Sequence, residues 1–161
     1  MPVIDEKLVN TIFFELKNQN LNIATAESCT GGLIGHTFTN VSGSSEYFDL
    51  GIIAYSNRAK VKLLDISELM LKKYGAVSKE VAKAMANRVR KILNVDIGLS
   101  TTGIAGPTGG TKEKPIGLVY IAVSTQKVNI VKKFNFSGDR LQIKDSTCNS
   151  ALEMLLDVLI M

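Results

Sequence analysis

The pattern of apolar and amphipathic segments predicts an α/β fold: one domain with a mixed central sheet and helices on both of its faces. Helical and strand-like segments alternate up to residue 102, which favours parallel strands joined by helices. Two strand-like segments then follow each other directly, at 117–124 and 128–136, and indicate a hairpin. The chain of 161 residues is the size of one ordinary domain and has no linker-like stretch. We therefore expect a single domain over residues 1–161.

The first 75 residues predict two strands among four helices. In order, these segments are a helix at 5–20, a strand at 21–26, a short helix at 33–38, a strand at 48–55, a short helix capped by Asn57 and a helix at 65–75. The first helix has apolar side chains at helical spacing, and the first strand is mostly apolar. Gly51 indicates a bulge or a close backbone approach, and Gly75 is placed to end the fourth helix.

The rest of the chain predicts three strands and two long helices. In order, these segments are a helix at 78–93, a strand at 96–102, the two strands of the hairpin and an amphipathic helix at 139–160. Ser78 is a suitable N-cap, because its hydroxyl can accept from a free N–H of the first turn. Residues 103–111 form the longest turn-rich stretch of the chain.

Composition excludes several classes of protein. Apolar residues make up 45% and charged residues 21%, as in an ordered globular protein. The net charge of +4 comes without clusters of basic and aromatic residues, so nothing argues for nucleic-acid binding. Cys29 and Cys148 have the spacing of neither a disulfide framework nor a zinc site. With no signal peptide and no apolar run near the roughly 20 residues of a membrane span, we expect a cytoplasmic protein without a membrane partner.

The segment from Thr25 to Gly32 concentrates the most chemistry. Two hydroxyls and a thiol stand at Ser28, Cys29 and Thr30, between a predicted strand and a predicted helix, and two glycines follow. The start of a helix presents unpaired N–H groups, so a nucleophile here would find groups that stabilise an oxyanion. The same residues are equally typical of a helix cap followed by a turn. From these residues alone, both interpretations stay open.

Three predicted strand ends carry polar or glycine-rich loops, at 27–32, 55–57 and 101–106. Ligands of open α/β sheets bind at the carboxyl ends of the strands, so these loops are expected to face one crevice. Neither glycine loop has the pattern of a Walker A or a dinucleotide-binding motif. With His36 as the only histidine, a serine–histidine–acid triad is not supported, and a serine–lysine pair is the economical alternative. Lys60 is the candidate base with Tyr55 nearby, although a lysine in a helical turn is usually a solvated surface charge.

At these residues the sequence resembles the CinA C-terminal-domain family, whose stand-alone members are nicotinamide-nucleotide amidases. The matching motifs occur in family order: AESCTGG at 26–32, VSGSS at 41–45, GIIAYSNRAK at 51–60, YGAVS at 74–78, TGIAGPTGG at 102–110, KPIG at 114–117 and GDR at 138–140. The resemblance departs at Arg58, where many relatives carry an acidic residue, and at Lys144, where many carry an arginine.

The resemblance implies a three-layer α/β/α sandwich and hydrolysis of the carboxamide of nicotinamide mononucleotide to nicotinate mononucleotide and ammonia. It implies Ser28 as the nucleophile, Lys60 as its base and Tyr55 as an assisting group. It also implies a set of substrate-binding residues: Thr30, Gly31 and Gly32 for the oxyanion, Thr102, Gly103 and Gly106 in the pocket wall, and Arg140 for the ligand phosphate. The expected partner is a small pyridine nucleotide, with no metal and no organic cofactor.

Other possibilities stay open at this point. Cys29 is a rival nucleophile, because thiolates at helix N-termini are activated, although a small buried hydrophobe is its more common role. The pocket could serve a non-catalytic nucleotide- or phosphate-binding module, or the chain could be a competence- or damage-associated partner protein. Apolar stripes on several helices leave room for a homo-oligomer, a dimer or a higher state.

Overall fold

Five strands form one mixed sheet in a computed structural model that describes residues 3–161. The strands are β1 (Ile23–Glu27), β2 (Phe48–Ile53), β3 (Ile97–Gly103), β4 (Leu118–Ser124) and β5 (Asn129–Asn135). Their order across the sheet is β2-β1-β3-β4-β5. β1 runs parallel to both β2 and β3, whereas β4 runs antiparallel to β3 and to β5. The predicted mixed sheet and its closing hairpin are therefore confirmed.

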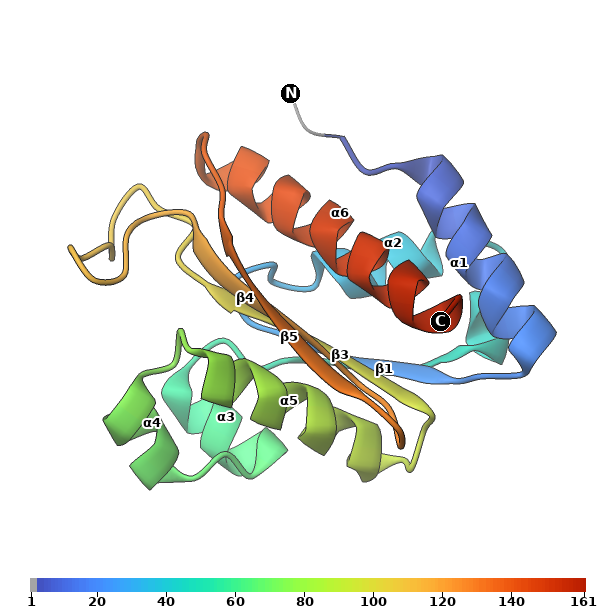
Figure 1. Cartoon of the computed structure of the whole chain (residues 1–161), viewed down its shortest axis with the longest axis horizontal. Coiled ribbons are helices and arrows are strands. Elements are labelled where there is room, and N and C mark those ends of the chain that lie inside the picture. Colours follow the sequence, from blue (N-terminus) through green and yellow to red (C-terminus); the bar gives the residue numbers. More distant parts are fainter. Residues whose placement is uncertain (1–2) are drawn as a thin grey trace.

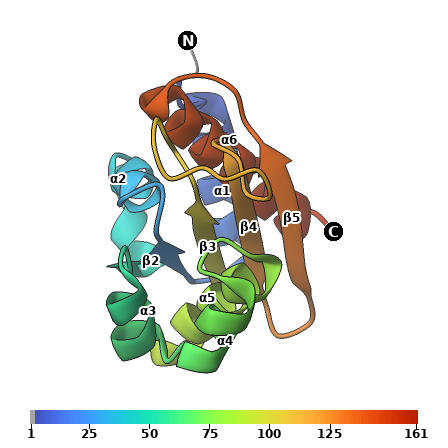
Figure 2. The same ribbon diagram turned by 90° about the vertical axis from the view of Figure 1, so that its left-hand side faces the viewer.

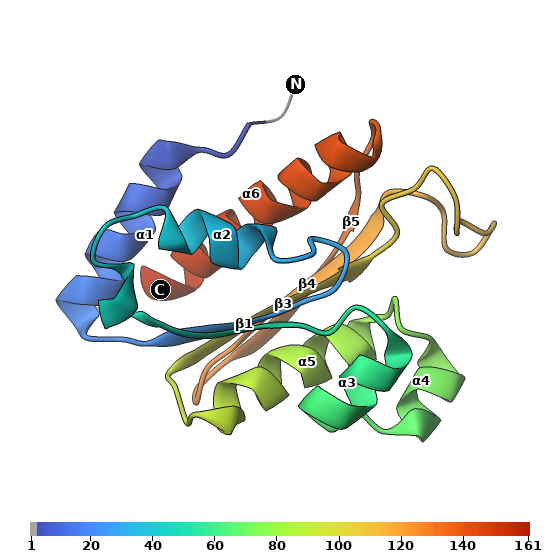
Figure 3. The same ribbon diagram turned by 180° about the vertical axis from the view of Figure 1, so that it is seen from behind.

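Helices cover both faces of this sheet. One layer consists of α1 (Glu6–Gln19), α2 (Leu33–Thr39) and α6 (Arg140–Leu159), and the other of α3 (Asn57–Leu64), α4 (Glu68–Tyr74) and α5 (Lys79–Ile92). Figure 1 shows the sheet between these two layers, and Figure 3 shows the same arrangement from behind. A 3-10 turn, η1 (Ser44–Glu46), leads into β2 and has no counterpart among the predicted segments. The three-layer α/β/α architecture is confirmed.

Most of the helices begin after an N-cap residue whose side chain accepts a hydrogen bond from the first turn. The predicted cap of α5 is confirmed, since Ser78 Oγ accepts from the Val81 N–H at 3.3 Å. The predicted cap of α3 is wrong by one residue: Ser56, not Asn57, stands at the N-cap, and its hydroxyl oxygen accepts from Ala59 N–H at 3.0 Å. Both side chains suit an N-cap, and the backbone decides between them, because Ser56 is extended whereas Asn57 is already helical.

Alternating side chains of the strands divide the interior into two main cores. Ile23 and Leu99 point into the core beneath α1, α2 and α6, whereas Ala24 and Ala26 point toward α5. Because successive side chains of a strand point to opposite faces, Glu27 lies on the same side as Ile23, beneath α2. A carboxylate is thereby brought into a mostly apolar layer, and its hydrogen-bond partners are described with the site below.

The polar loops converge at one edge of the sheet. β1, β2 and β3 end there, and β5 leads through Gly138 into the start of α6 at the same edge. Figure 2 looks onto this edge, where the long loop between β3 and β4 lies across the strand ends. In the part of the chain that the structure describes, none of the helices is long and apolar enough to cross a membrane.

Candidate active site

Ser28 lies at the floor of a cavity at this edge. It directly follows β1, and its N–H donates to Thr101 O on β3 at 3.0 Å. Its own carbonyl oxygen accepts from the Gly31 N–H at 3.1 Å, which closes the turn. The side chain is 7% exposed, and that exposure is toward the cavity. The turn therefore presents one hydroxyl from a rigid backbone.

Lys60 reaches the same point from α3 and is only 1% exposed. Its Nζ lies 3.0 Å from Ser28 Oγ, 3.0 Å from Ala54 O and 3.2 Å from Tyr55 O. Burial lowers the pKa of Lys60 below its ordinary value, because the charged ammonium loses hydration. A neutral amine in this position has two N–H groups for the two carbonyls and one lone pair left for the Ser28 hydroxyl proton. The geometry is therefore that of a serine and its base.

A cavity of about 340 Å³ opens above this pair. It brings together seven of the ten residues expected to be catalytic or substrate-binding: Ser28, Tyr55, Lys60, Thr102, Gly103, Gly106 and Arg140. Within residues 3–161, no Asp or Glu belongs to the lining, whereas Arg140 does, with a guanidinium that stays charged. The lining therefore favours a ligand that carries negative charge.

Arg140 and Tyr55 meet at the mouth of the cavity. Arg140 Nη1 donates to Gly106 O at 2.6 Å, and Nη2 donates to the Tyr55 hydroxyl at 3.0 Å. Asp139 caps α6 and holds Arg140 at the first position of that helix. The Tyr55 side chain is 60% exposed, and its hydroxyl contacts Arg140 rather than Ser28 or Lys60. An assisting role of Tyr55 stays a prediction.

The expected anion site at the start of α2 is already occupied. Gly32 N–H donates to the Glu27 carboxylate at 3.0 Å, and Gly31 N–H donates to Ser28 O. Thr30 is fully buried, and its hydroxyl donates to Glu27 at 2.6 Å. Thr30, Gly31 and Gly32 also lie outside the residues that line the cavity. The prediction of free N–H groups is therefore wrong for Gly32, which donates to the chain's own carboxylate, and for Gly31, which donates to a carbonyl. An oxyanion role for the Thr30 N–H stays a prediction.

Other amides of the lining are free. Among residues 3–161, the N–H groups of Cys29, Ala105 and Gly106 donate to no other group of the chain. All three residues line the cavity. The residue after Ser28 and the loop after β3 therefore supply free amides that can meet a developing oxyanion.

Cys29 is poorly suited to act as the nucleophile. Burial raises the pKa of its thiol to about 12, because a thiolate there would lose its hydration. At neutral pH the thiol is therefore protonated. The interpretation of Cys29 as a small buried hydrophobe fits this environment.

Thr102 has a mainly structural contact. Its hydroxyl donates to Ala76 O at 2.8 Å, which fastens the segment between α4 and α5 to the wall of the cavity.

The two departures from the family pattern lie apart from the lining. Arg58 is exposed in a groove between α3 and α4. The Lys144 Nζ approaches Gly31, where an added Cβ would lie 3.7 Å from it.

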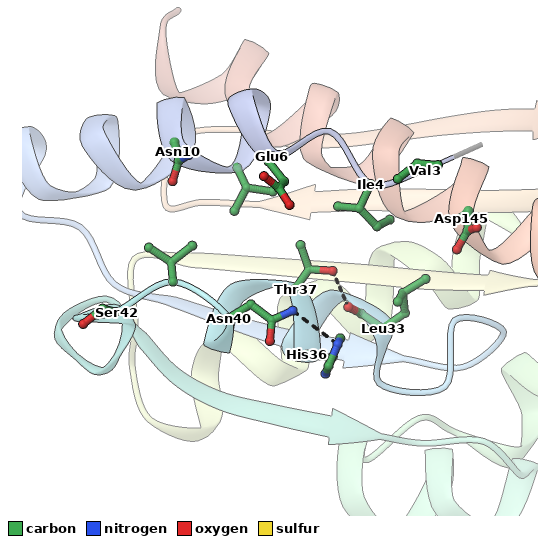
Figure 4. Close-up of a pocket in the computed structure, with 12 residues that line it drawn as sticks. Val3, Ile4, Glu6, Asn10, Leu33, His36, Thr37, Asn40, Ser42 and Asp145 are labelled. Carbon is green, nitrogen blue, oxygen red and sulfur yellow. Dashed lines mark hydrogen bonds between the residues drawn. The ribbon is translucent and has the colours of Figure 1, made fainter. Parts of the chain in front are cut away.

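A larger groove of about 720 Å³ lies on the other side of α2. Figure 4 shows it between α1, α2 and α6, with His36 on α2 and Asp145 on α6. The His36 ring pairs with Asn40 there at 3.2 Å and is not among the residues around Ser28. Because the described residues that line this groove include neither a serine–lysine pair nor a thiol, its size does not make it the better candidate for catalysis. Residues 3–161 also hold no group of three or more His, Cys, Asp or Glu placed to bind a metal ion.

Sequence reasoning missed three of the contacts that build the site. They are the carboxylate of Glu27 and the carbonyl groups of Ala54 and Tyr55. Glu27 left a usable signal, because it is an ionisable residue at the end of a mostly apolar strand. The two carbonyls left none, since every residue has one and only the fold determines which of them surround a lysine.

Fold and site together define a three-layer α/β/α protein with a buried serine–lysine pair at the carboxyl edge of its sheet. Residues 5–159 match the CinA C-terminal domain family. The chain belongs to this family.

Relatives and solved structures agree with this assignment. A provisionally named competence-damage inducible protein of Thermoanaerobacter pseudethanolicus is 49% identical over 153 residues, which are 94% of this chain and 37% of that protein. A CinA-like protein of Koribacter versatilis is 47% identical over 155 residues, or 96% of this chain and 37% of that protein. The chain thus spans little more than a third of the length of these relatives. The crystal structure of the competence/damage inducible protein CihA from Agrobacterium tumefaciens superposes with a TM-score of 0.94 at 35% identity, covering 100% of both chains.

Proposed function

We propose that this chain hydrolyses the carboxamide of nicotinamide mononucleotide to nicotinate mononucleotide and ammonia. One observation carries the proposal: the buried Lys60 Nζ lies 3.0 Å from Ser28 Oγ, and burial lowers the pKa of Lys60. A base with a lowered pKa within hydrogen-bond reach of a hydroxyl is the arrangement that nucleophilic catalysis requires. The choice of substrate rests on the family resemblance and on the guanidinium of Arg140 in the lining of the cavity.

The first half of the reaction uses Ser28 as nucleophile. Neutral Lys60 takes the hydroxyl proton while Ser28 Oγ attacks the carboxamide carbon. The negative charge on the carbonyl oxygen is met by free amides of the lining, such as that of Cys29. Lys60 then returns its proton to the departing nitrogen, the C–N bond breaks, and ammonia leaves an ester on Ser28.

The second half releases the acid. Water takes the place of ammonia, Lys60 accepts one of its protons, and the resulting hydroxide attacks the ester carbon. The C–Oγ bond breaks and Ser28 regains a proton from Lys60. Arg140 at the cavity mouth is the group proposed to hold the ligand phosphate, through charge-assisted hydrogen bonds. No metal or organic cofactor enters these steps.

Ammonia release from nicotinamide mononucleotide tests the proposal. The wild-type protein should turn over, whereas Ser28→Ala should lose activity and Cys29→Ala, its matched neighbour, should keep it. Tight binding of the mononucleotide without ammonia release would instead support a non-catalytic nucleotide-binding module. Equal turnover by Ser28→Ala and the wild type would overturn the mechanism.

The names of the relatives raise a second possibility, a role beside other proteins in competence or DNA damage. Nothing in the cavity favours that role over the amidase chemistry. It therefore enters only as an outcome: a stable stoichiometric partner in a pull-down, together with no turnover, would support it.

A further inference from the structure

Glu27 is a buried carboxylate next to Ser28 that takes no part in the proposed chemistry. It is 2% exposed and lies outside the residues that line the cavity. Four donors converge on its two oxygens: the Thr30 hydroxyl at 2.6 Å, and the N–H groups of Gly32 at 3.0 Å, Ile34 at 3.1 Å and Gly35 at 2.8 Å. A charge buried so completely is stable only when it is paired or fully hydrogen-bonded, and here it is fully hydrogen-bonded.

These contacts fasten the start of α2 to the end of β1. The three amide donors belong to the N-cap and first turn of α2, where free N–H groups favour a negative charge. Glu27 supplies that charge from within the chain. Ser28 lies between the two fastened elements. The Glu27 carbonyl oxygen also accepts from the Ala54 N–H at 2.9 Å, which ties the end of β1 to the segment that leads into α3 and Lys60.

A hydroxyl pair extends this network to the next strand. Thr30 Oγ1 lies 2.8 Å from Thr101 Oγ1. Because Thr30 gives its only hydroxyl proton to Glu27, Thr101 is the donor in this second bond. Thr101 also accepts the Ser28 N–H through its carbonyl oxygen. The carboxylate thus orients both segments that hold Ser28.

We propose that Glu27 is the positioning residue of the site, holding Ser28 Oγ against Lys60 Nζ through the turn at 28–32. The consequence for catalysis rests on the proposed function, whereas the consequence for Ser28 reactivity does not. Glutamine at position 27 keeps the shape but directs its own N–H₂ group at N–H donors. Aspartate keeps the charge but is one methylene too short to reach all four donors.

The test compares Glu27→Gln and Glu27→Asp with the wild type, and with Glu6→Gln as a matched control. Glu6 is an exposed carboxylate in the first turn of α1, so its loss reports the general effect of removing an acid from a helix start. Two reactions are measured. The first is hydrolysis of nicotinamide mononucleotide, which gives kcat and KM. The second is labelling of Ser28 by a fluorophosphonate, whose rate is obtained from the intact mass of the protein over time. Circular dichroism and Tm establish that each variant is folded.

We expect Glu27→Gln to lower both kcat and the labelling rate about 10- to 100-fold with KM within threefold, since small misplacements of a reacting group cost about this much. The aspartate variant should fall between glutamine and the wild type, and Glu6→Gln should match the wild type. If Glu27→Gln does not fold, Thr30→Val tests the same network and should lower labelling 3- to 10-fold. A folded variant with both rates within twofold of the wild type overturns the proposal. Labelled Ser28 without ammonia release overturns the amidase function alone, and the labelling rates of the variants still decide the role of Glu27.

Discussion

Replacing Lys60 separates its role as a base from its role as a charge. Lys60→Met removes the amine but nearly preserves the volume of the side chain, whereas Lys60→Arg retains a cation that stays protonated at every accessible pH. If Lys60 acts as the base, both variants lose about 10²- to 10⁴-fold in kcat/KM, which is about 3–5 kcal/mol of transition-state stabilisation. Ammonia release over pH 6–10 is the assay.

Structural damage does not account for a loss of this size. In Lys60→Met, the carbonyl groups of Ala54 and Tyr55 and the Ser28 hydroxyl each lose a hydrogen-bond partner, at about 1 kcal/mol each. The variant also avoids the cost of burying an ammonium group, which is several kcal/mol. The two terms are opposite in sign and similar in size, so we expect Tm to shift by only a few degrees.

The pH dependence of kcat/KM and of stability is an independent test of Lys60 as the base. Because burial lowers the pKa of Lys60, kcat/KM of the wild type should rise with pH through a midpoint below the ordinary lysine value. In the same interval the unfolded chain binds more protons than the native chain, so the free energy of unfolding also rises with pH. Lys60→Met should lack both effects. A folded Lys60→Arg that retains kcat/KM within tenfold would refute the reasoning, because it would show that a positive charge at this position is sufficient and that no base is needed.

Three further predictions concern neighbouring residues. Cys29→Ala should keep kcat within about threefold. The native thiol should react slowly with a disulfide reagent at pH 8, because its pKa is raised to about 12; loss of activity on thiol labelling would argue for a catalytic thiol. Arg140→Ala should raise KM for the mononucleotide about 10- to 100-fold and leave KM for the riboside unchanged, as expected when a charged phosphate contact is lost; equal effects on both ligands would contradict this. Thr102→Val should lower the free energy of unfolding by about 1–2 kcal/mol in urea, because the carbonyl of Ala76 loses its donor; an unchanged midpoint would contradict it.

Local patterns predicted most of the fold. The helix of α5 and its Ser78 cap follow from a 3.6-residue apolar period, and the closing hairpin follows from two strand-like segments joined by a short turn. The order of the strands does not follow in the same way. Whether β1 pairs with β2, with β3 or with both depends on contacts between segments that are far apart in sequence.

The site was predictable by residue type but not by hydrogen-bond partner. Strand ends in one sheet meet at a common edge, so Ser28 and Lys60 could be expected together. The use of the amides at the start of α2 depends on a competition between an external anion and the side chain of Glu27. The Glu27 side chain occupies these amides because it belongs to the same chain and loses no translational or rotational entropy on binding. The pattern of glycines and hydroxyls alone does not reveal this outcome.

The covalent intermediate on Ser28 is the most direct test of the central claim. Wild-type protein is mixed with nicotinamide mononucleotide, quenched in acid within the first turnover, digested and analysed by tandem mass spectrometry. We predict a peptide heavier by the mass of the nucleotide minus ammonia, with the added mass on Ser28 and absent from Ser28→Ala. An adduct on Cys29, or undiminished ammonia release by Ser28→Ala, would contradict the account.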